Sequence, residues 1–120
     1  MHAAKILVVD DDVVARDLLA DALKREGYEV EAYASGEEAI ARGREGRVDL
    51  VLTDIRMGAV DGLTVLREFK RMSQDTAIVV LTAFGSLEGA IEAIKQGAYD
   101  YLAKPFKKEE IKLVVQRSLD

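Results

Sequence analysis

Residues 49–54 read DLVLTD, an apolar run that ends in an aspartate, and this stretch decides the fold. Three other apolar runs have the same form, because each is short and is followed directly by a polar or charged residue. They read ILVV at 6–9 before Asp10, IVVL at 78–81 before Thr82, and YLA at 101–103 before Lys104. Strands that are apolar throughout are typical of a parallel sheet covered on both faces. Ligands bind at the carboxyl ends of such strands, so we expect the four polar ends to form one site.

Strand and helix patterns alternate five times along the chain. Strands are predicted at 5–9, 28–33, 49–53, 77–82 and 99–103, and helices at 13–26, 36–45, 62–72, 86–96 and 107–119. Regular alternation implies right-handed crossovers. The expected fold is therefore α/β, a doubly wound parallel sheet between two layers of helices.

Short polar motifs predict the ends of several helices. Asp12, Asp61 and Ser86 are expected N-caps, SGEE at 35–38 matches a capping box, and Gly27 is expected to stop the first helix. That helix carries two adjacent apolar stripes, which are Val14, Leu18 and Ala22, and beside them Ala15, Leu19 and Leu23. Stripes of this kind are typical of a helix that packs on a core.

The composition limits the class of protein. A chain of 120 residues corresponds to one domain, 1–120, which we expect to belong to a longer protein. The net charge of −5 argues against a nucleic-acid surface, and the absence of Cys excludes disulfide chemistry. No apolar run is long enough to span a bilayer, and the start of the chain does not read as a signal peptide. We therefore expect a cytoplasmic domain without direct nucleic-acid or membrane contact.

Four aspartates are expected to gather at one edge of the sheet. Asp10, Asp11 and Asp12 follow the first strand, and Asp54 follows the third. Asp12 is best interpreted as a helix cap, but the others need a further explanation. Two carboxylates about 4 Å apart repel by roughly 4 kcal/mol at an effective dielectric of 20, so a fold that keeps them needs something to offset that cost. Mg²⁺ does so, since proteins hold it with carboxylates, waters and phosphate oxygens.

Lys104 and Thr82 add groups that suit a phosphate. Lys104 follows a strand and precedes Pro105, which fixes the backbone. Its ammonium can contact a phosphoryl oxygen as a point charge. The Thr82 hydroxyl is of interest because this residue is the last of its strand. Together with the carboxylates, these residues indicate a Mg²⁺ and phosphoryl site.

With these residues in view, the whole chain resembles the receiver domain of a two-component response regulator. The matching segments are ILVVDD at 6–11, TDIRM at 53–57, DG at 61–62, LTA at 81–83 and KPF at 104–106. Their joint order and spacing make the resemblance specific. It implies a five-stranded flavodoxin-like sheet with strand order 2-1-3-4-5.

The resemblance also implies a set of metal and phosphate ligands. Asp54 would be the phosphoacceptor. Asp10 and Asp11 would form the acidic pair after the first strand, with Asp11 the more direct Mg²⁺ ligand. The backbone carbonyl of Arg56 would complete the protein ligands of the metal, and Lys104 would contact the phosphoryl oxygens.

The implied function is that of a signalling phosphoacceptor, not an enzyme, although the domain could assist its own phosphorylation and dephosphorylation. The donor would be a phosphohistidine on a sensor histidine kinase, and catalysis would consist of positioning and charge neutralisation. Thr82 and Tyr101 match the switch hydroxyl and the switch aromatic. They would alter the surface of the fourth helix, fifth strand and fifth helix, which would control an output domain or a downstream protein, or a homodimer formed on phosphorylation.

Finer features concern the output and the kinetics. Residues 54–57 and 97–106 are similar to receivers fused to sigma-54-type ATPase transcription activators, so a transcriptional output is expected.

Gly58 stands where many members of the family have Pro. Gly has more conformational freedom than Pro, which leaves the strength of Mg²⁺ binding open. The resemblance places Arg56 and Phe84 beside the path of the hydrolytic water, and their bulk predicts slow self-hydrolysis. Gly89 weakens the fourth helix by about 1 kcal/mol relative to Ala, so the first turn of that helix is expected to be the least stable helical segment and to reorganise on switching. Gly89 could instead serve only to allow a close packing approach.

Three alternatives stay open. A stand-alone or hybrid-kinase receiver in a phosphorelay would carry the same residues. A Mg²⁺-dependent aspartyl phosphatase would carry an Asp-x-Asp motif, whereas residue 56 is Arg. A flavin-binding module would need a phosphate nest rich in Gly, Ser and Thr, in place of the acidic loop at 10–12.

Overall fold

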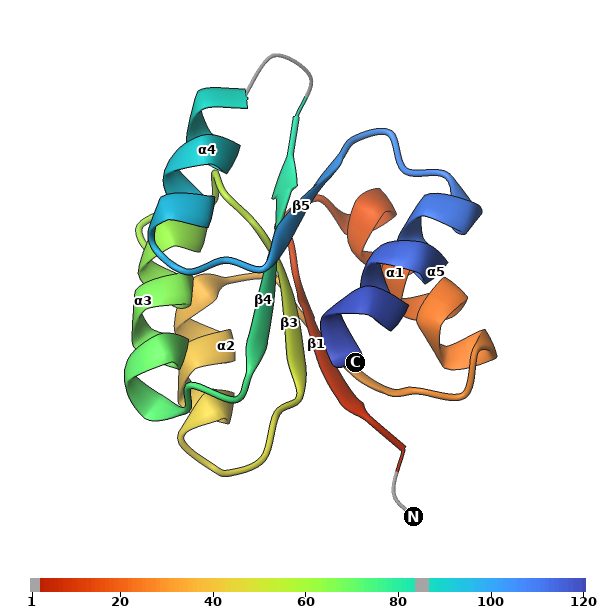
Figure 1. Ribbon diagram of the computed structural model, residues 1–120, viewed down its shortest axis with the longest axis horizontal. Coiled ribbons are helices and arrows are strands. Elements are labelled where there is room, and N and C mark those ends of the chain that lie inside the picture. The colour runs from red at the N-terminus through yellow and green to blue at the C-terminus, as the bar shows by residue number, and fades with distance from the viewer. Residues whose placement is uncertain (1–2, 84–86) are drawn as a thin grey trace.

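Five strands pair in parallel in the order β2-β1-β3-β4-β5 in the computed structural model, which describes residues 3–83 and 87–120. The predicted fold class and strand order are thus confirmed. The strands are β1 (Lys5–Val9), β2 (Glu29–Tyr33), β3 (Leu50–Asp54), β4 (Ala77–Thr82) and β5 (Asp100–Ala103). The helices are α1 (Val13–Arg25), α2 (Gly36–Gly43), α3 (Gly62–Met72), α4 (Leu87–Lys95) and α5 (Lys108–Leu119). Figure 1 shows α2, α3 and α4 on one face of the sheet, and α1 and α5 on the other.

The element ends differ from the predictions by one or two residues. Asp49 was expected inside a strand but precedes β3, and its carboxylate accepts a hydrogen bond from the backbone N–H of Lys5 at 2.8 Å. Asp54 is instead the last residue of β3. The second helix ends at Gly43 because the N–H of Glu45 bonds to the carbonyl of Arg42, three residues back, which begins a turn.

The expected helix caps are present where the structure describes them. Asp12 accepts a hydrogen bond from the N–H of Val14 at 3.0 Å, and Asp61 accepts one from the N–H of Thr64 at 2.9 Å. Gly27 follows α1 with a φ of 93°, a conformation that favours glycine. The predicted Ser86 cap, and Phe84, lie outside the described residues.

The capping box predicted at Ser35 is only half formed. The Ser35 hydroxyl accepts a hydrogen bond from the N–H of Glu38 at 3.2 Å, as expected. The Glu38 carboxylate, however, accepts from the same hydroxyl at 3.1 Å. The side-chain pairing therefore takes the place of the return bond to the backbone N–H of Ser35.

One apolar stripe of α1 faces the core and the other faces solvent. Ala15, Leu19 and Leu23 are buried, and the leucines pack with residues of β1 and β3 such as Ile6 and Leu50. Val14 and Leu18 are 73% and 42% exposed, so only one of the two apolar stripes packs on the core. The reason is geometric, because adjacent stripes of a helix point about 100° apart and the sheet covers only one of them.

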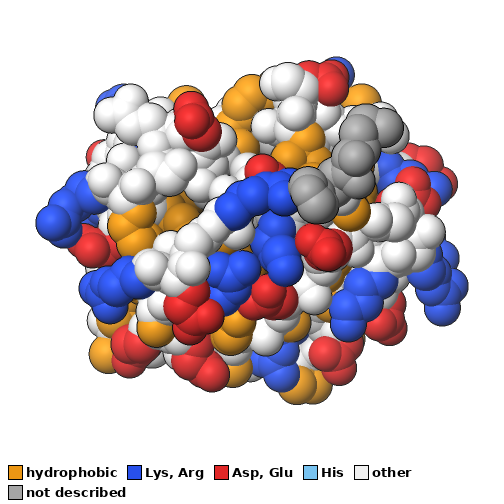
Figure 2. Space-filling model, turned by 90° about the horizontal axis from the view of Figure 1, so that it is seen from below, with side chains coloured by type: hydrophobic (Ala, Val, Ile, Leu, Met, Phe, Trp, Pro, Cys, Tyr) orange, Lys and Arg blue, Asp and Glu red, His pale blue; other side chains and the backbone are white. Residues whose placement is uncertain are grey.

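Charges of both signs cover the end of the molecule at which the strands begin. Figure 2 shows this end from below, with basic and acidic side chains interspersed. Several of them pair, including Arg47 with Asp49 at 2.8 Å and Arg42 with Glu31 at 2.8 Å. Among the described residues, no helix has the length and apolar character needed to cross a membrane.

Candidate functional site

The carboxyl ends of four neighbouring strands meet at one edge of the sheet, as the sequence predicted. Asp10 follows β1 directly, Asp54 ends β3, Thr82 ends β4, and Lys104 follows β5. Since β1, β3, β4 and β5 are consecutive in the sheet, their last residues lie side by side. The site is therefore a direct consequence of the parallel arrangement.

Lys104 connects the two buried carboxylates of this edge. Its Nζ lies 2.9 Å from Oδ2 of Asp54, to which it donates a hydrogen bond, and 2.8 Å from Oδ2 of Asp10. The backbone N–H of Lys104 donates to the carbonyl of Thr82 at 2.8 Å, which continues the β4–β5 ladder up to the site. The peptide bond between Lys104 and Pro105 is cis.

Asp10 is the most deeply buried acid of the site, with no exposed surface. Its Oδ1 accepts a hydrogen bond from the N–H of Asp12 at 2.9 Å. Its Oδ2 forms the ion pair with Lys104, but this contact lacks hydrogen-bond geometry, so within the described part of the chain that oxygen has no hydrogen-bond partner. Burial raises the pKa of Asp10, as does the Asp54 charge, although Lys104 and the N–H of Asp12 oppose the rise.

The ammonium of Lys104 is stabilised in its charged form. Burial by itself would lower the pKa of Lys104. The close contacts with Asp10 and Asp54 and the negative charges of these two carboxylates outweigh this effect and raise the pKa of Lys104. A positive charge thus lies between the two buried carboxylates of the site.

Three carboxylates are arranged so that they could hold a metal ion. One oxygen from each of Asp10, Asp11 and Asp54 lies within 4.8 Å of the other two. Asp11 is exposed, whereas Asp10 and Asp54 are buried. The all-oxygen donor set fits a hard cation such as Mg²⁺, and Oδ2 of Asp10, which has an ion pair but no hydrogen bond in the described part of the chain, is one of the oxygens available to it.

The loop after Asp54 is tied back to the start of α3. The N–H of Arg56 donates to Oδ1 of Asp54 at 3.1 Å, so Arg56 contacts this carboxylate through its main chain while its side chain is exposed. The N–H of Gly62 donates to the carbonyl of Ile55 at 2.8 Å. A Cβ at position 62 would overlap the carbonyl oxygen of Asp54, so only glycine permits this close approach.

The two predicted switch residues occupy different environments. Thr82 is buried at the end of β4. Tyr101 is 41% exposed and pairs with Val80 in the β4–β5 ladder, while Thr82 pairs with Ala103. Tyr101 therefore lies on the surface, two residues before Ala103, the residue of β5 that pairs with Thr82. The switch roles of both residues stay predictions.

One further contact to the site was missed in the sequence. Arg16, in α1, donates a hydrogen bond from Nη1 to the backbone carbonyl of Asp10 at 2.9 Å. Any residue offers a carbonyl, so no residue pair marks such a contact in the sequence. The only available signal was the position of Arg16 one turn into the helix that follows the acidic loop.

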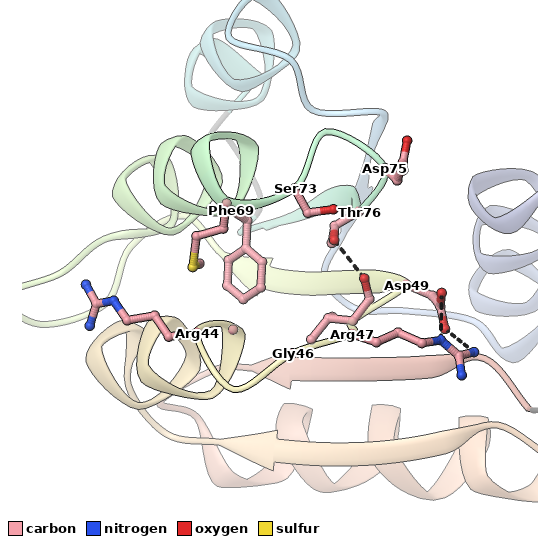
Figure 3. Close-up of a pocket in the computed structure, with 11 residues that line it drawn as sticks. Arg44, Gly46, Arg47, Asp49, Phe69, Ser73, Asp75 and Thr76 are labelled. Atoms are coloured by element: carbon pink, nitrogen blue, oxygen red, sulfur yellow. Dashed lines mark hydrogen bonds and ion pairs between the residues drawn. The ribbon is translucent and has the colours of Figure 1, made fainter.

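A separate pocket of about 740 Å³ lies at the opposite end of the sheet. Figure 3 shows its lining, with Phe69 at the base and Arg44, Arg47 and Asp75 around it. The Thr76 hydroxyl in this pocket donates to the carbonyl of Val48 at 2.7 Å. None of its lining residues belongs to the acidic cluster.

Comparison with known proteins identifies the family. The model of the response regulator receiver domain matches residues 6–116. Transcriptional regulatory protein ZraR of Salmonella typhimurium is 43% identical over 114 residues, which cover 95% of this chain and 26% of ZraR. Regulatory protein AtoC of Escherichia coli is 37% identical over 115 residues, which cover 96% of this chain and 25% of AtoC.

A solved structure agrees closely with this fold. The receiver domain of NtrX from Brucella abortus matches with a TM-score of 0.91 and 39% identity, over 95% of this chain and 97% of that domain. The chain spans about a quarter of the length of ZraR and AtoC. The family expected from the motifs is confirmed, and the relatives include the transcriptional regulators expected from residues 54–57 and 97–106. The chain belongs to the receiver domains of two-component response regulators.

Proposed function

We propose that this domain accepts a phosphoryl group on Asp54 from a phosphohistidine of a sensor histidine kinase, with Mg²⁺ as its cofactor. The observation that carries the proposal is the position of Lys104, whose ammonium contacts both Asp54 and Asp10. A lysine used only to neutralise one acid would need a single partner. Here it stands among three clustered carboxylates, one of them fully buried, so its charge is available to phosphoryl oxygens as well as to the acids.

The transfer is a displacement at phosphorus. A carboxylate oxygen of Asp54 forms a bond to phosphorus while the bond from phosphorus to the imidazole nitrogen breaks, and that nitrogen keeps the electron pair. Lys104 stays in place and neutralises charge on the phosphoryl oxygens. Mg²⁺, when bound by Asp10, Asp11, Asp54 and the carbonyl of Arg56, supplies further neutralisation of that charge.

The product is read at the surface of α4, β5 and α5. A phosphoryl group adds up to two negative charges at the sheet edge, and Thr82 would move to donate a hydrogen bond to it. Tyr101, now exposed, would turn toward the space that Thr82 leaves. This surface already carries exposed apolar side chains, which are Leu87, Ile91 and Ile94 on α4, and Tyr99 and Tyr101 near β5.

The proposed output is the control of transcription, and the domain is proposed to act in the cytoplasm. In relatives named as transcriptional regulators, such as ZraR and NtrC of Azospirillum brasilense, the matching region is about a quarter of the length, so further domains would receive the signal. The altered surface would contact such a domain or a second copy of the receiver. A receiver in a phosphorelay would carry the same site, and only the attached domains distinguish the two.

Phosphorylation by acetyl phosphate tests the proposal. Wild type should incorporate one phosphoryl group in millimolar Mg²⁺, as measured by intact mass, and Asp54→Asn should incorporate none. Asp75→Asn is a matched control, because Asp75 is an exposed aspartate at the opposite end of the sheet. Mg²⁺ should raise the melting temperature of wild type, and Asp54→Asn should raise it without Mg²⁺, since one repelling charge is removed. Phosphorylation that persists in Asp54→Asn would refute the assignment.

A further inference from the structure

We propose that Arg16 is a positioning residue for the metal site, acting on the direction of Asp11. The guanidinium holds the peptide group that joins Asp10 to Asp11, and so directs the Asp11 carboxylate toward Asp10 and Asp54. This inference rests on the proposed function, because it assumes that the three carboxylates bind Mg²⁺.

The contact is well defined in the structure. Arg16 is the fourth residue of α1, it is half-buried, and its Nη1 donates to the carbonyl oxygen of Asp10 at 2.9 Å. A hydrogen bond from a charged donor to a carbonyl is stronger than one between neutral groups. The side chain thus reaches back over the start of its own helix to the acidic loop.

Besides the bonds that Asp12 accepts at the start of α1 and the ion pair of Asp10 with Lys104, the acidic loop is held at three points, and each holds Asp10 or Asp12. The N–H of Asp10 donates to the carbonyl of Tyr33 at 3.1 Å, and the N–H of Asp12 donates to Oδ1 of Asp10 at 2.9 Å. The third point is the bond from Arg16 to the Asp10 carbonyl. That carbonyl belongs to the peptide plane leading into Asp11, so its orientation sets where the Asp11 side chain begins.

Asp11 depends on this main-chain support more than its neighbours do. It is exposed, and within residues 3–83 and 87–120 no hydrogen bond fixes its carboxylate. Asp10 and Asp54 are instead buried and paired with Lys104. The position of the third ligand therefore follows from the backbone that Arg16 holds.

A role for Arg16 through charge alone would have the opposite effect on metal binding. No carboxylate forms an ion pair with Arg16 in the described part of the chain, so its positive charge lies unneutralised beside the acidic cluster. A nearby cation repels Mg²⁺. Removing that charge should tighten Mg²⁺ binding if Arg16 acts only electrostatically, and should weaken it if Arg16 positions Asp11.

The test is whether the loss of Arg16 weakens or tightens Mg²⁺ binding. Arg16→Leu keeps an apolar stem and removes the donor, and we expect its Mg²⁺ dissociation constant, measured by calorimetric titration, to rise about tenfold. Arg25→Leu removes the same charge from an exposed position in the last turn of α1 and should change the constant by less than about twofold. Arg16→Lys, which keeps a cationic donor, should recover part of the affinity. The rate of phosphorylation by acetyl phosphate should return to that of wild type at saturating Mg²⁺.

Thermal melting in EDTA separates positioning from a merely structural role. An Arg16→Leu protein that melts at a lower temperature but binds Mg²⁺ as tightly as wild type, or more tightly, would overturn the inference. If Arg16→Leu does not fold, Arg16→Met, which also has an apolar stem and no donor, is measured in its place, and a rise or fall of its Mg²⁺ dissociation constant is interpreted in the same way. A wild-type domain that binds no Mg²⁺ would refute the proposed cofactor itself, which distinguishes that failure from a failure confined to Arg16.

Discussion

Gly89 of α4 lies directly against Ile55, the residue that follows Asp54 in the chain. A Cβ atom on Gly89 would lie 3.3 Å from Cδ1 of Ile55, closer than side chains normally pack. Ile55 is itself held by two main-chain bonds, one to the carbonyl of Leu81 at 3.2 Å and one from the N–H of Gly62 at 2.8 Å. One side chain therefore separates the strand of Asp54, the proposed phosphoacceptor, from the helix expected to move.

Gly89→Ala should alter the balance between the two states of α4. Alanine favours a helix by about 1 kcal/mol over glycine, but its methyl group would press on Ile55. We expect amide hydrogen exchange at 87–91 to be faster than in α1 in wild type, to change on phosphorylation, and to be slower in Gly89→Ala. Exchange that is as slow as in α1 and unaffected by phosphorylation would mean that the signal leaves by another surface.

Asp10 should make the metal-free domain less stable as the pH rises. Burial raises the pKa of Asp10 above the ordinary value of 3.8, so the folded protein binds this proton more tightly than the unfolded chain does. The resulting stabilisation is complete below the unfolded pKa and is lost as pH rises through the folded pKa. In EDTA, the unfolding free energy of Asp10→Asn minus that of wild type should therefore increase from about pH 4 upward and then level off.

The control for this measurement is the same pair of proteins in saturating Mg²⁺. A bound cation offsets the cost of the ionised carboxylate in wild type. The difference in unfolding free energy between Asp10→Asn and wild type should therefore stay constant or decrease as the pH rises. Chemical denaturation at several pH values measures both series. A difference between wild type and Asp10→Asn that does not vary with pH in EDTA would show that Asp10 has no raised pKa.

The sequence predicted what depends on local pattern and strand order. Asp10, Asp54, Thr82 and Lys104 each end an apolar strand, and the parallel topology alone brings such ends together. Contacts that depend on side-chain reach could not be predicted in the same way. The double contact of Lys104 requires the distance between β1 and β3, and the contact of Arg16 ends on a carbonyl that any residue could provide.

The first helix shows the same limit at the level of packing. Its two apolar stripes are equally plausible in the sequence, and only the position of the sheet decides that Leu19 is buried and Leu18 is exposed. Periodicity identifies the helix, but it does not assign a face when more than half of the circumference is apolar. The stripe that stays exposed, with Val14 and Leu18, is then a candidate surface for contact with another protein.

Gly58→Ala should make the loop after Asp54 more rigid without strain. Gly58 is exposed, its φ is not positive, and a Cβ built on it meets no atom within 4 Å. Where the native backbone suits alanine, this exchange stabilises a protein by about 0.4–1 kcal/mol through the unfolded chain. We expect a higher melting temperature and somewhat tighter Mg²⁺ binding, because the carbonyl of Arg56 would be better positioned. Weaker Mg²⁺ binding would indicate that the loop needs the freedom of glycine.

Leu18→Ala should slow phosphorylation by the kinase but not by acetyl phosphate. Leu18 and Val14 line a groove of about 320 Å³ with Pro105, Phe106 and Lys104. Lys104 also contacts Asp54, so the groove borders the site, and we expect a protein that delivers a phosphoryl group to Asp54 to cover it. An exposed leucine in such a place contributes by burial on contact, and its loss should slow transfer by about tenfold, which corresponds to 1.4 kcal/mol.

Two comparisons make the Leu18 experiment specific to docking. Leu113→Ala removes an equally exposed leucine from α5 that does not line the groove, and it should leave transfer from the kinase unchanged. Acetyl phosphate needs no docking surface, so its rate reports only on the site of Asp54 and Lys104. If Leu18→Ala slows both donors equally, the substitution disturbs the phosphoryl site, and the groove is not where the donor protein binds. If it slows neither, the kinase must approach Asp54 from the side of α4, where Leu87 and Ile91 offer the other exposed apolar surface.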